Sequence, residues 1–507
     1  MTALADWAPR AGKVLGTATR LAQKVAWALF LICLPVTSFP YFPRVFGGSA
    51  LVRPLSLYPL IVLVLLFTLP YLLRKPIPRT LLLIIPFILV GIASSLVSTL
   101  RGVESTVEVS QVMRILRALV TLAIGVAMYF TVALYAKSCE ELRGSLRWLY
   151  LGFAVALLWG SLQAVYIVDF DSNYYHKLVR LQTFLSTRKL FNSRVSGMTY
   201  EPNWFAVQIS ALLVPLLLSS ILSGFSAFRW RWRWLTIEWF ILAWAVVVLA
   251  FTFSRAGLAI LLLLAFVGFF FLRRHKPSPH LARSRRRVWA WRGLEAGAVL
   301  VALVGLIYVA SLKNPFFARI WSYWSEVENP SLADYAEYLG FEARFRYSAA
   351  ALNTYQAYPV LGVGLGNYAF YFPEMMPDEP LAALPELLRL IVPEGNRVRL
   401  ITPKNFYYRL LAETGLVGLA AFLAFLVGIL GCALYLWLSS DKEQKYWGRA
   451  GLLGMVAFAA SALSFDSFAI PNMWVAFGLT TSAAWIASRQ APVEAGEPRQ
   501  IEVSEIS

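Results

Sequence analysis

The most constraining feature of this chain is a succession of apolar segments, each about as long as the 20 residues that a helix needs to cross a bilayer. Of the 507 residues, 59% are hydrophobic and only 15% are charged, which is typical of a polytopic membrane protein. We therefore predict an all-α polytopic membrane protein with about twelve transmembrane helices. The predicted spans are 22–41, 54–73, 80–99, 113–136, 148–168, 204–223, 235–253, 256–272, 293–312, 407–437, 448–465 and 468–487.

Lysine and arginine residues are concentrated in segments that all fall on one side of the membrane if these spans are correct. The positive-inside rule makes that side cytoplasmic. The net charge of +18 then reflects topology and contact with anionic membrane lipid, and no nucleic-acid partner is expected. The Trp-rich stretch 229–234 is interpreted in the same way, as an interface belt at the cytoplasmic end of a span. The basic segments are 10–24, 74–79, 137–147, 229–233, 273–292 and 442–449.

The spans divide the chain into five parts, of which one is a large loop on the outer side. Helices are expected in this loop at 315–328 and 341–358. The polar tail of mixed charge is expected to be disordered. In order, the parts are a cytoplasmic segment (1–21), the first nine spans (22–312), the large extracytoplasmic loop domain (313–404), the last three spans (405–487) and the cytoplasmic tail (488–507).

A glycine-spaced stretch, PVLGVGLGNY from Pro359 to Tyr368, precedes the tenth predicted span. Its glycines are not a nucleotide-binding fingerprint, because no βαβ unit surrounds them. They are interpreted as a tight turn that brings the backbone close to its neighbours. After the turn, Lys404 and Asn405 form a short polar entry to the apolar span, and Lys404 shares a helical face with Gly415.

These two stretches resemble the O-antigen ligase and O-antigen polymerase superfamily. In its last large-loop motif, the family usually has His-Asn, then nine residues and Gly; here Lys404 stands in place of the histidine, and Asn405 and Gly415 match. The upstream PVLGVGLGNY resembles the family's glycine-spaced segment. The resemblance covers the second half well and the first half only by hydropathy. It implies a glycosyltransferase C-like membrane fold and transfer of a glycan from an undecaprenyl-diphosphate carrier.

Before the sixth predicted span, a second group of residues resembles the family's Arg-x-x-Gly segment followed by Pro-Asn. Arg194 matches the arginine, and Asn203 matches the asparagine of the pair. Pro202 also suits the first turn of a helix, where its missing N–H costs nothing. Glu201 and Asn203 are therefore candidates for substrate binding, with an ordinary helix start as the alternative.

Further arginines could serve the same site. Arg255 lies between two apolar spans with almost no loop, at the predicted outer bilayer edge, where a charge is costly unless it snorkels, pairs or serves a site. The family has a Ser-Arg pair at the corresponding place. Arg344 or Arg346 resembles an arginine that precedes the family's glycine turn by about fifteen residues; the sequence leaves open which of the two.

Arginines at the outer surface are suited to bind the diphosphate of the lipid-linked donor that the resemblance implies. A guanidinium binds phosphate bidentately and keeps its charge. The diphosphate leaves as an anion when the glycosidic bond breaks, and stabilising that charge would be the main catalytic effect. No metal or other cofactor is expected: the three cysteines are too scattered for a metal site, and Asp169 and Asp171 form a short acidic pair at a span end.

The acceptor hydroxyl must lose a proton, and the family's histidine would suit that task. Lys404 can act as the base only if its pKa is lowered, and it can otherwise hold phosphate as a fixed cation. The alternative bases are Glu201, Glu413, which could simply pair with Arg409, and His176. The predicted catalytic residues are Lys404, Arg194 and Arg255, and the predicted substrate-binding residues are Arg344, Arg346, Asn405, Glu201 and Asn203.

The predicted function is transfer of a glycan from undecaprenyl diphosphate to lipid A-core or to a growing polysaccharide, on the outer face of the bacterial cytoplasmic membrane. An O-antigen ligase is favoured slightly over a polymerase by the motif at Asn405 and Gly415. A transporter or flippase is the alternative from another class. It should place charges near the bilayer midplane, whereas the centres of these spans are almost free of charge. A scaffold for an envelope complex would tolerate the loss of single arginines.

Overall fold

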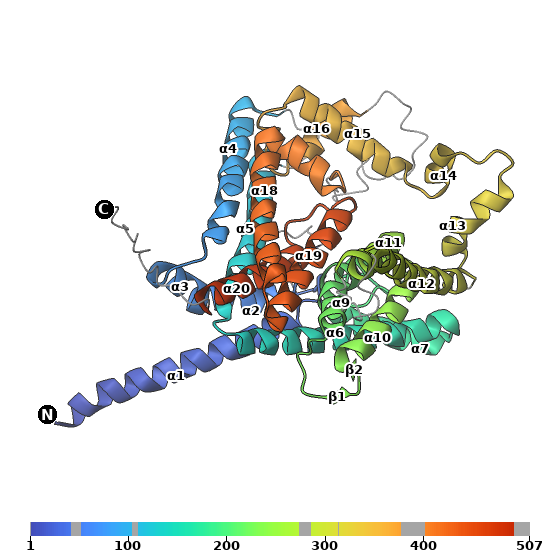
Figure 1. Ribbon diagram of the computed structural model, residues 1–507. Helices are drawn as coiled ribbons and strands as arrows, with labels where there is room; N and C mark the ends of the chain where they lie inside the picture. Colours follow the sequence, from blue (N-terminus) through green and yellow to red (C-terminus); the bar gives the residue numbers. More distant parts are fainter. Residues whose placement is uncertain are drawn as a thin grey trace, which may run out of the picture.

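Helices make up most of the described chain, as the apolar segments predict (Figure 1). The computed structural model describes residues 2–41, 52–103, 110–272, 285–312, 314–376 and 401–490. In these ranges the only strands are β1 (Arg231–Trp232) and β2 (Leu235–Thr236), which pair antiparallel as a small hairpin. The helices before this hairpin are α1 (Thr2–Ile32), α2 (Leu57–Leu63), η2 (Val64–Thr68), α3 (Leu69–Arg74), η3 (Arg79–Ile84), α4 (Ile85–Arg101), α5 (Gln111–Tyr135), α6 (Cys139–Val168), α7 (Ser172–Leu185), α8 (Pro202–Gln208), η4 (Ile209–Leu213) and α9 (Val214–Ser223).

The chain after the hairpin continues as helices and includes both predicted helices of the large loop, which are confirmed as α13 and α15. Four short helices, α13 to α16, lie along the top and right of Figure 1. The helices after the hairpin are α10 (Ile237–Phe251), α11 (Arg255–Val267), η5 (Gly268–Leu272), α12 (Arg285–Ser311), α13 (Pro315–Glu326), α14 (Leu332–Tyr338), α15 (Glu342–Ala357), α16 (Tyr368–Met375), α18 (Phe406–Leu438), α19 (Lys442–Ser461) and α20 (Pro471–Gln490).

Every predicted span overlaps one of these helices or a continuous run of them. Within the described residues, eight helical segments are long and apolar enough to cross a membrane, and α10 is apolar but shorter. The chain is thus a mostly helical, multi-pass membrane protein, while the total of twelve spans stays a prediction. The predicted tail falls outside the described residues from position 491 onward. The eight segments are α2–α3, η3–α4, α5, α6, α8–α9, α11–η5, α12 and α18.

The first predicted span differs from the structure at its end. The prediction covered 22–41, but α1 ends at Ile32 and a non-helical stretch follows. Pro35 lies in this stretch, where it lacks an N–H and restricts the residue before it. The backbone of Thr37 and Phe39 instead exchanges hydrogen bonds with Arg53.

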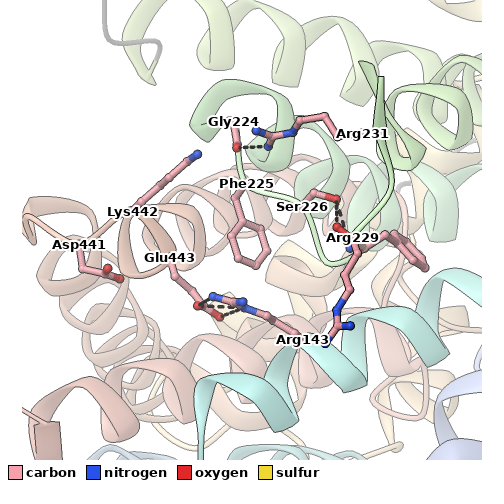
Figure 2. A pocket seen from close by; sticks show the side chains of 10 residues that line it. Arg143, Gly224, Phe225, Ser226, Arg229, Arg231, Asp441, Lys442 and Glu443 are labelled. Atoms are coloured by element: carbon pink, nitrogen blue, oxygen red, sulfur yellow. Dashed lines mark hydrogen bonds and ion pairs between the residues drawn. The ribbon is translucent and has the colours of Figure 1, made fainter. Parts of the chain in front are cut away.

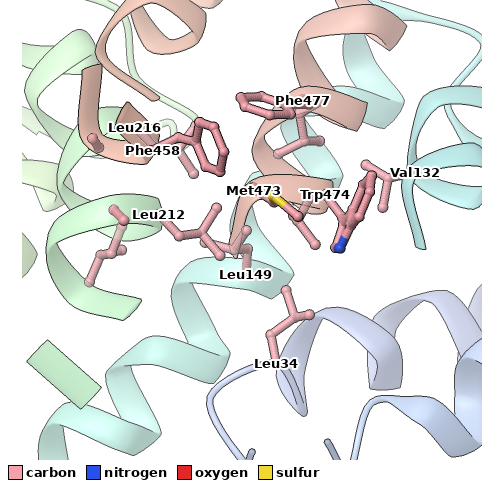
Figure 3. Packing of buried hydrophobic residues seen from close by; sticks show 14 of the residues in the cluster. Leu34, Val132, Leu149, Leu212, Leu216, Phe458, Met473, Trp474 and Phe477 are labelled. Carbon is pink, nitrogen blue, oxygen red and sulfur yellow. The ribbon is translucent and has the colours of Figure 1, made fainter. Parts of the chain in front are cut away.

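The apolar core is centred on α18, which packs against α4, α19 and α20. Figure 3 shows Met473, Trp474 and Phe477 of α20 within this core, near Val132 of α5. A side chain at Gly125 of α5 would overlap the Trp474 ring, so the small residue lets α5 and α20 pack closely.

Several helices run between the same two ends of the molecule. At one end, the Phe406 N–H at the start of α18 donates to the Ala462 carbonyl just after α19. At the other end, Ser219 of α9 donates to the Tyr446 carbonyl near the start of α19. The end of α9 therefore lies at the second end. The start of α8, at the opposite end of the same continuous helical run, lies at the first end. The end of α10 lies there too, because the Phe251 carbonyl accepts a hydrogen bond from the Val195 N–H, in the loop before α8.

Candidate functional site

The polar entry to α18 is built around a helix cap. The Asn405 Oδ1 accepts hydrogen bonds from the N–H groups of Tyr407 (3.0 Å) and Tyr408 (3.2 Å), which satisfies two donors that the first turn leaves unpaired. The cap explains why an asparagine directly precedes the first turn of α18. A role for Asn405 in substrate binding stays a prediction.

Lys404 lies just before this cap in a left-handed backbone conformation, with a φ of 52°. Its N–H donates to the Asp466 Oδ2 at 2.8 Å. Its Nζ lies 4.8 Å from the centroid of the Tyr347 ring of α15. The face of an aromatic ring attracts a cation, so this contact holds the ammonium group against α15.

The glycine-spaced stretch docks into a break in α18 at Gly415, where φ is 64° and ψ is −167°. The N–H groups of Val363 and Gly364 donate to the carbonyls of Ala412 and Glu413, both at 2.9 Å. A side chain at Gly415 would clash with the carbonyl group of Val360. The structure thus agrees with the interpretation of this stretch as a tight turn in close backbone contact, and Gly415 is needed for the contact.

Below the cap, charged side chains tie α18 to the connection that contains Asp466, and α5 to the glycine-spaced stretch. The Arg409 Nε donates to the Glu413 Oε2 at 2.9 Å, and both side chains are buried. Arg409 also donates to the backbone carbonyl of Asp466. The Arg114 Nε of α5 donates to the Gly366 carbonyl at 2.9 Å. Because the Glu413 carboxylate is already paired, it is poorly suited to act as a free base.

The loop before α8 carries Arg194 against the end of α10. Its Nε donates to the Thr252 carbonyl at 2.9 Å, and its Nη2 donates to the Asn203 Oδ1 at 3.1 Å. Burial lowers the pKa of the Arg194 guanidinium to about 10; Glu201 opposes this shift, and Arg255 adds to it. Arg194 thus contacts Asn203 directly and the backbone three residues before Arg255, so the three residues lie in one region.

Glu201 faces a different arginine. Its Oε1 lies 3.1 Å from the Arg188 Nη1, and the Arg188 guanidinium also lies over the Tyr200 ring, 5.0 Å from its centroid. Both charged side chains are partly exposed, so the pair contributes little to stability. Pro202 occupies the first turn of α8, as its position in the sequence predicts.

Arg255, the first residue of α11, reaches the segment that leads into α15. Its Nη1 donates to the Leu339 carbonyl at 2.7 Å. Of the two arginines on α15, Arg346 is ion-paired with Glu342 at 3.5 Å. The Arg344 guanidinium makes no hydrogen bond or ion pair within the part of the chain that the structure describes, so it is the better candidate to meet a ligand.

These contacts close a ring around one end of the helices. From Arg255, the ring passes through Leu339 and along α15 to Tyr347, which lies against Lys404. Lys404 is bonded to Asp466, and the neighbouring Phe465 ring lies 6.1 Å from the Trp204 ring. Trp204 follows Asn203, the partner of Arg194, which completes the ring. We call this set the outer ring: Arg194, Asn203, Trp204, Arg255, Leu339, Tyr347, Lys404, Phe465 and Asp466.

The remaining candidates have local roles. Asp171 caps α7, where its Oδ1 accepts hydrogen bonds from the N–H groups of Asn173 (2.7 Å) and Tyr174 (3.2 Å). His176 on the same helix bonds through Nδ1 to the Ser172 carbonyl at 2.6 Å. In the described ranges no three His, Cys, Asp or Glu side chains gather as a metal site would require. Metal independence itself stays a prediction.

Sequence reasoning missed three members of this region: Asp466, Tyr347 and Arg114. Arg114 could have been found, because a charge inside a predicted span is costly and calls for a partner. Asp466 lies in a short Ser-Phe-Asp-Ser connection between the last two spans and carries no motif of its own. Only the docking of this connection against Lys404 reveals it.

Residues 240–423 match the sequence model of the O-antigen ligase family, which confirms the predicted resemblance for this segment. The matched segment contains Arg255, α15, the glycine-spaced turn and Lys404, while Arg194 lies before it. No curated protein sequence matches the chain. The family match supports a role in glycan transfer of the ligase or polymerase type, with lipid-linked glycan substrates in a membrane.

Proposed function

We propose that this protein transfers a glycan from undecaprenyl diphosphate to an acceptor hydroxyl at the outer face of the bacterial cytoplasmic membrane. The acceptor that we favour is lipid A-core, as in an O-antigen ligase; a second lipid-linked glycan, as in a polymerase, is the alternative. The observation that carries the proposal is the outer ring, in which contacts link Arg194, Arg255 and Lys404, from three separate parts of the chain, at one end of the helices.

The arginines suit the leaving group. In the reaction the acceptor oxygen bonds to the anomeric carbon, and the bond from that carbon to the diphosphate oxygen breaks. The electron pair stays on the diphosphate, and the acceptor proton passes to a base. Arg194 bonds to the Thr252 carbonyl, three residues before Arg255, so both arginines belong to one region, and a diphosphate bound there would be stabilised as its charge develops.

Two roles remain for Lys404, a fixed cation or a base, and the Tyr347 ring favours the cation. A proton acceptor is then needed beside it. Asp466 is half-buried, and its Oδ2 accepts a hydrogen bond from the Lys404 N–H, whereas Glu201 and Glu413 are both paired with arginines. We assign Asp466 the task of orienting the acceptor hydroxyl and taking its proton.

Transfer by the purified protein in membranes tests this function. The assay supplies a lipid-linked glycan donor, either with lipid A-core or alone, and resolves the products on a gel. A ligase attaches the glycan to lipid A-core, and a polymerase lengthens the donor-linked glycan. Movement of the lipid-linked glycan across the membrane with no covalent product under either condition would favour the transporter.

Two further measurements test the chemistry that we assign. Asp466→Asn should lower transfer by about 100-fold or more, as expected for loss of a general base. Asp441→Asn is the matched control, since Asp441 caps α19 at the opposite end. Transfer should also persist in excess EDTA. Loss of activity on chelation, restored by magnesium or manganese, would contradict metal independence.

A further inference from the structure

At the far end of the same helices, the structure forms a cavity of about 450 Å³ with a strongly charged lining (Figure 2). Arg143 and Arg229 lie on one wall, Lys442 lies on the opposite wall, and Arg231 lies at the rim beside Gly224. Asp441 and Glu443 are the acidic residues of the lining. Four basic side chains thus face two acidic ones, which gives the cavity a positive charge.

The basic side chains divide into two that are engaged and two that are available. Arg143 is held by the Glu443 carboxylate, with its Nε 3.0 Å from both oxygens. The Arg231 Nη2 donates to the Gly224 carbonyl at 3.0 Å. Within the described chain, the Arg229 guanidinium and the Lys442 ammonium make no hydrogen bond or ion pair. A guanidinium and an ammonium that face one cavity without partners are suited to bind a phosphate.

The wall of the cavity is held in place from behind. Buried Glu238 accepts hydrogen bonds from the Ala227 N–H (2.8 Å) and the Ser226 hydroxyl (3.0 Å). The Arg147 Nε donates to the Ala227 carbonyl at 2.6 Å. The loop from Gly224 to Phe228 is therefore fixed by two charged groups, so the cavity is preorganised and does not depend on the ligand for its shape.

A second cavity, also of about 450 Å³, has an almost purely apolar lining. One of its lining residues, Trp230, directly follows Arg229 of the first cavity in the sequence. Trp230 and Phe240 form part of its wall, with ring centroids 5.9 Å apart, and about half of each side chain is exposed. Its other lining residues are Ile237, Ile241 and Trp244. The segment that leads into the hairpin thus carries a cation of the first cavity and an aromatic residue of the second at adjacent positions, Arg229 and Trp230.

We propose that this pair of cavities binds an anionic phospholipid. Arg229 and Lys442 hold its phosphate, and its acyl chains lie against Trp230 and Phe240. A lipid has a phosphate and hydrocarbon in one molecule, whereas free phosphate would use only the first cavity. A basic cavity at the end of membrane-spanning helices is also where a lipid headgroup lies. This proposal does not depend on glycan transfer.

Native mass spectrometry of the full-length purified protein tests the proposal, with phosphatidylglycerol and zwitterionic phosphatidylcholine supplied in equal amounts. Wild type should retain phosphatidylglycerol preferentially. Arg229→Gln combined with Lys442→Gln should reduce that retention by about tenfold, as expected for loss of charge-assisted hydrogen bonds. Arg233→Gln is the matched control, because Arg233 is an exposed cation of the same hairpin that does not line the cavity. Arg229→Gln alone, at an exposed position, serves if the double variant does not fold.

Several results would overturn the proposal. Equal retention of both lipids would show that charge does not select the ligand. An equal loss in Arg233→Gln would reduce the effect to the general attraction of a basic belt. Trp230→Ala distinguishes a lipid from free phosphate, because it should weaken lipid retention. If inorganic phosphate displaced the lipid completely and Trp230→Ala had no effect, the cavity would be a site for soluble phosphate.

Discussion

The outer ring and the basic cavity lined by Arg143, Arg229, Arg231 and Lys442, which we call the hairpin cavity, are two basic regions at opposite ends of the same helices, and they hold their charges in different ways. In the outer ring, Arg194, Arg255 and Lys404 come from distant parts of the chain and bond to backbone carbonyls or lie on an aromatic ring. In the hairpin cavity, the available cations Arg229 and Lys442 have no such partners within the described chain. The first region orients its cations in advance, as the proposed transfer would require, and the second leaves them available for the proposed ligand.

The length of α19 separates the two regions. It has 20 residues, so it spans about 30 Å at 1.5 Å per residue, which is the thickness of a bilayer core. One bound molecule cannot place its phosphate in both regions. The two regions should therefore respond independently to substitution, and the following predictions use that independence.

The largest expected effect is an all-or-none difference in accessibility. In a background with Cys33, Cys139 and Cys432 replaced by serine, Leu332→Cys reports on the ring end and Trp232→Cys on the hairpin end; both side chains are well exposed. An impermeant maleimide applied to intact spheroplasts should label only Leu332→Cys. In permeabilised cells the reagent should label both cysteines. Labelling of Trp232→Cys alone would reverse the predicted topology and move the site to the cytoplasm.

Next in size is the loss of donor binding. Arg194→Ala and Arg255→Ala should each lower glycan transfer by about 100-fold or more, because each removes charge from the developing diphosphate. Lysine at either position should rescue poorly, since an ammonium lacks the guanidinium fork. Glycan ladders from membranes with matched expression measure this. Arg180→Ala and Arg229→Ala, at exposed positions outside the ring, are the controls and should retain transfer. Normal ladders from both ring variants would remove the arginines from the mechanism.

A pH-dependent effect is expected at Lys404. If Lys404 is a fixed cation, Lys404→Arg should keep substantial activity. Lys404→His should be active when the imidazole is protonated and should lose activity as pH rises above its ordinary pKa of about 6.5. Transfer rates of the three proteins across a pH series measure the difference. An inactive Lys404→Arg beside an active Lys404→His would instead make Lys404 the base, because arginine cannot become neutral.

The smallest expected effect is on the stability of α18. This helix is broken at Gly415, near the outer ring, and is regular toward its C-terminal end. Gly415→Ala should destabilise the protein by about 1–3 kcal/mol through backbone strain, with a further cost from the clash with Val360. Gly431→Ala on the same helix has open space around it and should be neutral or slightly stabilising. Thermal unfolding in detergent compares the two variants. Equal stability would mean that the glycine turn does not need its close contact with α18.

Much of the fold could be predicted because the controlling signals are local. An apolar stretch of bilayer length predicts a helix wherever it lies. Pro202 occupies the first turn of α8, and Asn405 caps the start of α18. The outer ring was predictable in part, because Arg194, Arg255 and Lys404 each lie at the edge of a span. The expected topology placed all three on the same side of the membrane, but it did not predict their contacts with other residues.

The sequence by itself determined the helices, the membrane setting and the family resemblance of the second half, since each depends on neighbouring residues. Only the tertiary structure decided that Asp466 lies beside Lys404, that Tyr347 covers its ammonium, and that Arg188 pairs with Glu201. Asp466 and Tyr347 are separated from Lys404 by tens of residues, and no local pattern encodes a contact over that distance. The packing of α15 and of the last connection against the start of α18 brings them together, and that packing is a property of the whole chain.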